Sequence, residues 1–506
     1  MTRVVLVKNS KPMPVLVGVG QLTNRSKDPE TKGDPIDYMV ECAKRAAEDA
    51  GDQDILPQID SMAIIRVMSR DYTHEPGQVA ELLGVKPNDL VYTTDGATLP
   101  QILTTRLCDR IARGQSEMGL ICAAEAFHSS EKPDWKRLTS ADYGKFPFAV
   151  FGDRMDHATA TEKKYGLYFP SIVYPLFANA FRKSQNLTLE DYIWETALLC
   201  EKMSKVAQKN EYAWFRDAKS ALEISTVTKE NRIIHYPFTK FMNAIMNVDQ
   251  AAALLVISEG KADAFGIPKD KRVYLIGSSE VYDKWHISNR VNYSSAPGLE
   301  LAFEKAFAEA GTTKEDIEFW DLYSCFPVAT QIAIKTLNLP ASVTPTIIGG
   351  LPYFGGAGNH YSLHAICEMV RLLRGSPEKK GVVQSLTWHM NKFSVGIYSG
   401  TRPEAYELSS AERYKYDIEN RFPNRTILEA AQGTFIVETY VVSYNRDGMP
   451  VLAVIVANNE SGDRLFAVND GNLALLRSMS TVEPIGKRVN IYHDASSGLN
   501  RFSDIF

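Results

Sequence analysis

The sequence predicts an α/β protein with a duplicated core, an inserted helical segment and a small C-terminal β domain. The duplication rests on residues 43–51, AKRAAEDAG, whose pattern returns in residues 303–311, FEKAFAEAG. An apolar, strand-like run follows each copy, IDSMAII at 59–65 and IEFWDLY at 317–323. Two helix–glycine–strand units at half-chain distance indicate two similar halves; a chance likeness between two alanine-rich helices is the alternative.

Each copy has the pattern of a helix that ends at a glycine. Apolar residues recur with helical spacing, and Gly51 or Gly311 follows the last turn. Glycine adopts the left-handed conformation that closes many helices. The runs after the two glycines are apolar on both faces, which is typical of strands buried in a sheet covered by helices.

The remaining elements of the core follow the same logic. VLVGVG at 15–20 predicts a buried strand. A helix is expected to begin near Thr98, with Pro100 in its first turn, and to end at Gly114. NVDQAAALLVISEGKADAFGIP at 247–268 predicts a strand and a further helix.

These patterns divide the chain into four expected domains. The first half of the core comprises residues 1–127 and 246–278, and the second half comprises residues 279–402. Residues 128–245 are polar and aromatic, with helical stretches such as LTLEDYIWETALLCEKMSKVAQ and little strand pattern. This segment is expected to be a helical loop insertion that lies over the core.

Residues 415–506 have the pattern of a separate β domain. Three β-rich runs are separated by turn signals at 446–448, Arg-Asp-Gly, and 460–462, Glu-Ser-Gly. Such turns between β-rich runs predict an antiparallel meander. A small barrel of the oligonucleotide/oligosaccharide-binding (OB) type suits this pattern. Nucleic-acid binding is not expected, because the segment lacks a clear strand face that is both basic and rich in aromatic residues.

Composition excludes several classes of function. The formal net charge of −5 over 506 residues argues against nucleic acid or an anionic membrane as partner. No apolar stretch reaches 18 residues, and the N-terminal MTRVVLVKNSKP is too polar for a signal peptide, so a cytoplasmic protein is expected. The six cysteines show no CxxC spacing, so neither a disulfide framework nor a metal site is expected.

Over residues 10–400 the chain resembles the thiolase superfamily, and most closely the branch called thiolase-like protein type 1, which has an added C-terminal β domain. The resemblance implies two βαβαβαββ halves stacked as an α-β-α-β-α sandwich. Five segments carry it, in the order in which thiolases have them: PVLVGVGQLT at 14–23, DGATLPQ at 95–101, NVDQAAALLV at 247–256, DLYSCFP at 321–327 and GGLPYFGGAGNHYSLHA at 349–365.

The first catalytic position of a thiolase is a cysteine at a helix N-terminus, where the helix dipole and a histidine favour the thiolate. The matching stretch here is Asp95-Gly96-Ala97-Thr98, which contains no cysteine. Cys108 lies about three turns further along the predicted helix. Asp95 and Thr98 remain as nucleophiles, and neither matches a thiol in thioester chemistry.

The other thiolase positions are also altered. The Gly-His-Pro motif is replaced by Gly355-Gly356-Ala357, and His360 and His364 come after it, either as substitutes or as polar histidines on a helix face. The position of the second cysteine falls in residues 385–400, which contain none; His389 and Asn391 occupy the neighbourhood. The resemblance therefore implies that the usual ping-pong condensation does not run.

Two hypotheses about function arise from the resemblance. In the first, the protein belongs to the acetyl-CoA acetyltransferase family by fold and binds CoA or an acyl-CoA non-covalently in lipid metabolism. The expected ligand-binding residues are those of the glycine-rich loop, whose alternative role is close packing at the sheet edge: Gly355, Gly356, Gly358 and Asn359.

The second hypothesis is a thiolase-like lyase that cleaves a β-hydroxyacyl-CoA by a retro-aldol reaction. Such aldolases place a tyrosine in a LYDxF-type motif, which matches Tyr323 of LYSCF, and Tyr361 is the candidate second tyrosine. The match departs at Ser324, where those aldolases have Asp. Cys325 is expected to be a packing residue. A purely structural role remains a third alternative, and a monomer or a homodimer is expected.

Overall fold

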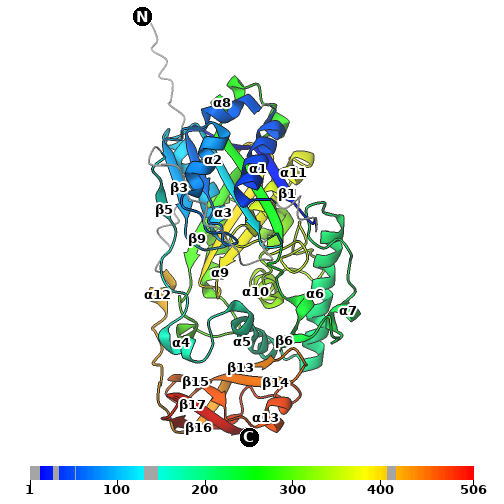
Figure 1. Ribbon diagram of the computed structural model, residues 1–506, viewed down its shortest axis with the longest axis vertical. Coiled ribbons are helices and arrows are strands. Elements are labelled where there is room, and N and C mark those ends of the chain that lie inside the picture. Colours follow the sequence, from blue (N-terminus) through cyan, green and yellow to red (C-terminus); the bar gives the residue numbers. More distant parts are fainter. Residues whose placement is uncertain (1–11, 27–32, 52, 130–145, 407–416) are drawn as a thin grey trace, which may run out of the picture.

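The computed structural model (Figure 1) describes residues 12–26, 33–51, 53–129, 146–406 and 417–506. Residues 1–11, which carry most of the segment interpreted as too polar for a signal peptide, lie outside the described residues. Within the described ranges, every helix is too short or too polar to cross a bilayer.

The first half of the core is built around a six-stranded sheet in the order β1-β8-β4-β2-β3-β5. Strands β2, β3, β4 and β5 are parallel to one another, and β8 runs antiparallel to both β1 and β4. The elements are β1 (Pro14–Thr23), α1 (Pro35–Ala50), η2 (Gln53–Gln58), β2 (Ser61–Ile64), α2 (Glu75–Leu83), β3 (Asp89–Thr93), α3 (Leu99–Ala112), β4 (Met118–Ala126), β5 (Ala149–Phe151), β8 (Asp249–Ser258) and α8 (Glu259–Ala264).

The two glycines of the predicted strand VLVGVG explain how closely α1 lies on β1. A Cβ atom added at Gly18 would be 2.1 Å from the carbonyl oxygen of Ala46, and one added at Gly20 would be 2.0 Å from that of Cys42. Any side chain at these two positions would therefore force the helix away from the sheet.

The second half repeats the first with a sheet of four strands instead of six in the described chain. Its sheet has the order β10-β11-β12-β9. Where the third strand would lie, the chain runs beside β10, and Leu322 N donates to the carbonyl oxygen of Pro345 over 2.8 Å. The elements are η4 (Lys269–Lys271), β9 (Tyr274–Tyr282), η5 (Ile287–Asn289), α9 (Pro297–Ala310), η6 (Lys314–Asp316), β10 (Ile317–Leu322), α10 (Pro327–Leu337), α11 (Tyr361–Gly375), β11 (Lys380–Thr387) and β12 (Lys392–Ser399).

The predicted duplication is confirmed by these elements. Helix α1 ends at Gly51 and α9 at Gly311, both with positive φ, and a 3-10 turn leads from each helix to β2 or β10. One boundary differs from the expected division, since β9 begins at Tyr274, inside the segment assigned to the first half, and pairs in the second sheet.

The two sheets enclose a layer of helices. Helix α3 contacts β8 of the first sheet and β12 of the second, and α11 likewise contacts β8 and β11. Helices α1 and α9 cover the outer faces, α1 on β1 and α9 on β9. The chain therefore has the predicted α-β-α-β-α sandwich.

The insertion joins the core to the C-terminal domain (Figure 1). Helix α5 packs against β13 of that domain, where Asn179 Nδ2 donates to the carbonyl oxygen of Tyr440 over 2.9 Å. The hairpin β6–β7 adds to the same strand. The elements of the insertion after β5 are α4 (Ala160–Lys164), α5 (Pro170–Ser184), α6 (Leu189–Lys209), α7 (Ala221–Ser225), β6 (Ile233–Tyr236), β7 (Phe238–Thr239) and η3 (Lys240–Met242).

The C-terminal domain is a closed five-stranded barrel. The strands are arranged in the cyclic order β13-β14-β15-β17-β16-β13, and only β15 and β17 pair in parallel. This is the strand order of an OB-type barrel, as predicted. The elements are α12 (Asp417–Arg421), β13 (Gly433–Tyr444), β14 (Pro450–Asn458), β15 (Arg464–Asn469), α13 (Leu473–Ser478), β16 (Arg488–Asp494) and β17 (Leu499–Ile505).

Candidate functional site

A cavity of about 880 Å³ lies where both halves of the core meet the insertion. The core contributes the start of α3, the loop after β10, the glycine-rich loop before α11 and the turn between β11 and β12. The lining of the cavity includes Met68, Gly96, Ala97, Phe169, Phe215, Lys219, Lys240, Met246, Tyr323, Cys325, Gly356, Gly358, Asn359, Thr387 and Trp388.

The stretch Asp95–Thr98, which the sequence analysis matched to the position of the thiolase cysteine, reaches this cavity through Gly96 and Ala97, not through Thr98. Thr98 is buried, and its hydroxyl shares a hydrogen bond of 2.8 Å with the hydroxyl of Thr387. Ser394 Oγ also donates to the carbonyl oxygen of Thr98 over 3.3 Å. These bonds fix the N-terminus of α3 against β11 and β12 and leave an alanine at the cavity wall.

Asn359 ties the glycine-rich loop to the same stretch. Its Oδ1 accepts a hydrogen bond of 2.9 Å from Gly96 N, and its Nδ2 lies 3.3 Å from Asp95 Oδ1. Asp95 in turn pairs with Arg66 over 2.7 Å. The three side chains form a polar cluster at the end of the cavity that contains Gly96.

The glycines of the loop pack closely against their neighbours. A Cβ atom at Gly355 would be 2.3 Å from Gln250 Oε1, and one at Gly358 would be 2.4 Å from Glu125 Oε1. The N–H groups of Gly356 and Gly358 donate to the carbonyl oxygens of Ile245 and Gly356. Gly356 and Gly358 line the cavity, whereas Gly355 packs on β8.

Glu125 is a buried carboxyl group that the sequence analysis missed. Its two oxygens accept hydrogen bonds of 2.8 and 2.7 Å from the N–H groups of Met68 and Ser69. Burial raises its pKa to about 7, against the effect of those bonds. The signal in the sequence was a charged residue in the otherwise apolar strand MGLICAAEAF.

Tyr323 and Cys325, from the loop after β10, both line the cavity. Tyr323 is 4% exposed, and burial raises its pKa well above the usual value. Burial also raises the pKa of the Cys325 thiol to about 12, although a hydrogen bond with Tyr174 acts in the opposite direction. Both groups are therefore protonated at neutral pH.

Tyr361, the second candidate tyrosine, packs beside Tyr323 outside the cavity lining. The two rings meet edge to face with centroids 5.6 Å apart. The Tyr361 hydroxyl lies 3.4 Å from Thr346 Oγ1, which itself donates to Asp321 Oδ2 over 2.8 Å. The hydroxyl of Tyr361 therefore belongs to a buried network with Asp321.

His360 and His364 lie under the glycine-rich loop, fully buried. His364 Nδ1 bonds Gln21 Oε1 over 2.7 Å, whereas the two ring nitrogens of His360 have no hydrogen-bond partner among the residues that the structure describes. Burial lowers the pKa of His360 to about 3, so the imidazole is neutral. The two rings are 5.4 Å apart, and neither lines the cavity.

His389 and Asn391 also lie behind the cavity wall. His389 Nε2 is 3.1 Å from the carbonyl oxygen of Tyr168, and burial lowers the pKa of His389 to about 3. The residues of that turn which line the cavity are Thr387 and Trp388, which the sequence analysis missed. Trp388 has positive φ, and its ring stacks on His157 at a centroid distance of 3.9 Å.

The insertion supplies an apolar rim and charged residues of both signs, since Asp217 and Glu230 line the cavity as well as two lysines. Phe169 and Phe215 are 66% and 42% exposed, so the cavity opens to solvent beside them. Lys219 and Lys240 line the same region, and the Lys219 ammonium lies 4.5 Å from the centroid of Phe241. The aromatic and polar composition of residues 128–245 was the only sign of this rim in the sequence.

The C-terminal domain and the whole chain both match known proteins. Residues 419–496 match a family model described as the thiolase-like protein type 1 additional C-terminal domain. A crystal structure of a monomeric SCP2-thiolase like protein type 1 from Mycobacterium smegmatis is similar over 97% of this chain and 99% of that chain, with 30% sequence identity and a TM-score of 0.84.

Two more distant structures share the fold. An acetyl-CoA acetyltransferase from Syntrophomonas wolfei is 16% identical over 78% of this chain and 100% of that chain, with a TM-score of 0.55. A structure described as an Ltp2-ChsH2(DUF35) aldolase is 16% identical over 78% of this chain and 99% of that chain, with a TM-score of 0.58. At this identity the likeness concerns the fold alone.

Proposed function

The chain belongs to the thiolase-like protein type 1 family, and from that premise we propose that it binds acyl-CoA thioesters in the cavity without forming an acyl-enzyme. One observation carries the proposal: the stretch that replaces the thiolase nucleophile, the glycine-rich loop and the β11–β12 turn all line one cavity of about 880 Å³. Ligand pockets of this size are typically apolar with a few placed polar groups.

The lining suits the two chemically different ends of such a ligand. Phe169, Phe215 and Trp388 offer apolar surface to an acyl chain or to pantetheine. Lys219 and Lys240 offer positive charge to phosphate groups. Lys240 is exposed and Lys219 half-buried, near the exposed Phe215, which supports an orientation with the nucleotide outside and the thioester inside.

No acyl-enzyme is expected, because the groups at the inner end of the cavity are poor nucleophiles. Ala97 has no nucleophilic atom, and the Thr98 hydroxyl is engaged by Thr387. The Cys325 thiol, whose pKa is raised to about 12, is protonated at neutral pH. A thiol without an adjacent base is a poor nucleophile in this state.

Calorimetric titration with a medium-chain acyl-CoA, such as octanoyl-CoA, tests the proposal. Binding in the micromolar to millimolar range is expected for the natural protein. Ala97→Phe should weaken it by roughly tenfold or more, because the added ring overfills the inner end of the cavity. Ala264→Phe, the same change at an exposed position of α8, serves as the control and should bind normally.

Variants of the two lysines test the proposed orientation of the ligand in the same titration. Lys219→Gln and Lys240→Gln should each weaken octanoyl-CoA by about threefold, as expected for an exposed charge pair. Binding of octanoyl-pantetheine, which has no nucleotide, should not change in these variants. No heat with millimolar octanoyl-CoA, or normal binding by Ala97→Phe, would contradict the proposal.

A lyase is the second candidate, because Tyr323 lines the same cavity as Gly356, Gly358 and Asn359. In a retro-aldol reaction a tyrosinate takes the hydroxyl proton of a β-hydroxyacyl thioester while hydrogen bonds hold the enolate. The raised pKa of Tyr323 opposes this role, since its hydroxyl must lose the proton first. The lyase therefore ranks second.

Tyr323→Phe separates the lyase from the binding protein. If Tyr323 is catalytic, the variant loses retro-aldol release from a β-hydroxyacyl-CoA while its acyl-CoA affinity and melting temperature stay close to normal. Product release can be followed by chromatography under saturating substrate. A natural protein that binds the substrate but releases no aldehyde or ketone product would eliminate the lyase.

A further inference from the structure

Arg464 is a fully buried arginine in β15 of the barrel. Its guanidinium binds both carboxylate oxygens of Glu438, at 2.8 and 2.7 Å. Its Nη1 atom donates to two carbonyl oxygens of the core, 2.6 Å to Ser288 and 2.9 Å to Arg290. Arg464 therefore connects the barrel to the segment of residues 283–295, which we call the 283–295 loop.

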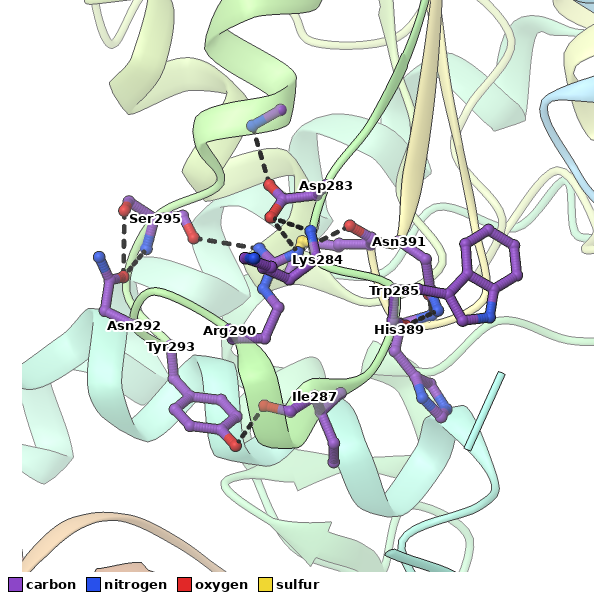
Figure 2. Close-up of polar contacts among 12 residues, drawn as sticks. Asp283, Lys284, Trp285, Ile287, Arg290, Asn292, Tyr293, Ser295, His389 and Asn391 are labelled. Carbon is purple, nitrogen blue, oxygen red and sulfur yellow. Dashed lines mark hydrogen bonds and ion pairs between the residues drawn. The ribbon is translucent and has the colours of Figure 1, made fainter. Parts of the chain in front are cut away.

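Arg290, which is also fully buried, connects the 283–295 loop to the core on its other side. Figure 2 shows Arg290 at the centre of the loop, next to Asp283 and Ser295. Arg290 Nη1 lies 3.1 Å from Asp283 Oδ1 and donates to the carbonyl oxygen of Met390 over 2.9 Å. Because Met390 is in the β11–β12 turn, the loop joins the barrel to the cavity wall.

The β11–β12 turn has a backbone that needs such support. Trp388 and Met390 have φ of 49° and 59°, a left-handed conformation that costs a non-glycine residue about 1 kcal/mol or more. Tyr174 donates to the carbonyl oxygen of Trp388 over 2.8 Å, and Arg290 donates to that of Met390. Asn391 contributes further bonds to Trp285 and His389 (Figure 2).

We propose that Arg464 is a positioning residue for the ligand cavity: by fixing Arg290 it holds the β11–β12 turn in its left-handed conformation, with Trp388 in the cavity wall. The barrel is then part of the support of the binding site, although no barrel residue lines the cavity in the described chain. The effect of Arg464 on affinity rests on the proposed function, whereas its effect on Trp388 does not.

Arg464→Gln tests this inference with two independent readouts. The first is acrylamide quenching of Trp388, obtained as the difference between each protein and the same protein with Trp388→Phe. Quenching should increase, because the turn loosens and the indole, which is half-buried in the natural protein, becomes more accessible. The second is octanoyl-CoA affinity, which should fall by about tenfold. Arg464→Lys, which keeps a cation but not the fork of donors, should give an intermediate result.

Arg501→Gln is the matched control in the same barrel. Arg501 pairs with Asp494 over 2.7 Å at the barrel surface, and its loss should change neither readout. If Arg464→Gln does not fold, Arg290→Lys tests the same connection from within the core, because it alters the group that donates to the carbonyl oxygen of Met390. Normal quenching of Trp388 in folded Arg464→Gln or Arg290→Lys overturns the inference. If the natural protein binds no acyl-CoA, only the proposed function fails, and the quenching result stands.

Discussion

Each half of the core has a buried carboxyl group in its sheet, Glu125 on β4 and Asp321 on β10. Burial raises the pKa of each to about 7. For a carboxyl group whose pKa is higher in the folded state, folding becomes less favourable as pH rises from the unfolded to the folded pKa. Both residues are therefore expected to lower stability between about pH 4 and pH 7.

Asp321→Asn should remove part of this pH dependence. The Asn oxygen can accept the bonds that Thr346 Oγ1 and Ile347 N now donate to Asp321 Oδ2, at 2.8 and 3.1 Å. Near pH 4 the variant and the natural protein should be about equally stable. Near pH 8 the variant should be more stable by roughly 1–3 kcal/mol, as measured by urea unfolding across the pH range.

Asp316→Asn provides a control of opposite sign. Hydrogen bonds from Thr313 and Thr312 lower the pKa of Asp316, so its charge stabilises the folded state above its usual pKa. The Asn variant should therefore be less stable at neutral pH, with the difference vanishing in acid. An Asp321→Asn variant with the same pH dependence as the natural protein would show that Asp321 is not a buried, titrating group.

At the scale of elements, the sequence predicted most of the structure that depends on local pattern. Helices α1 and α9 and strands β2 and β10 were recognised because alanine-rich helical spacing, a closing glycine and an apolar run occur within about 25 residues. The barrel was recognised from turn signals between β-rich runs. In contrast, β5 is only Ala149–Phe151, and too short for a pattern to show.

The candidate site was predictable only where the chain resembles a known motif. Ala97, Tyr323 and the loop at Gly356–Asn359 were located in this way, and the cavity includes all three. Trp388 and Lys219 were missed because their place at the cavity depends on how a turn and an insertion pack on the core. Local sequence carries no signal for such long-range contacts.

At the scale of the whole molecule, the insertion and the barrel change the surroundings of the thiolase-like core. The short strand β5 pairs in parallel with β3 and covers the side of β3 that would otherwise be the edge of the first sheet. The similar Mycobacterium smegmatis protein is described as monomeric. For the present chain a monomer or a homodimer remains the prediction, and an OB-type barrel fused to the core is the established feature.

A second hollow, of about 600 Å³, is the alternative place where a nucleotide ligand could bind. It lies between α6 and α11, and Lys202, Lys205 and Arg371 are among its lining residues. These cations are exposed or paired, as Arg371 is with Glu368. If positive charge alone decided where a nucleotide binds, the hollow between α6 and α11 would be preferred. The combination of apolar rim, lysines and thiolase-like loops instead favours the cavity beside Tyr323.

The crystal structure of a complex with octanoyl-CoA tests the central claim most directly. The account predicts an intact thioester whose carbonyl group lies beside Gly96, Ala97 and Thr387, with the phosphates toward Lys219 and Lys240. No bond to the chain is expected. Continuous density from the acyl carbon to Thr98 or Cys325, or a ligand bound only in the hollow at Lys202 and Arg371, would contradict the account.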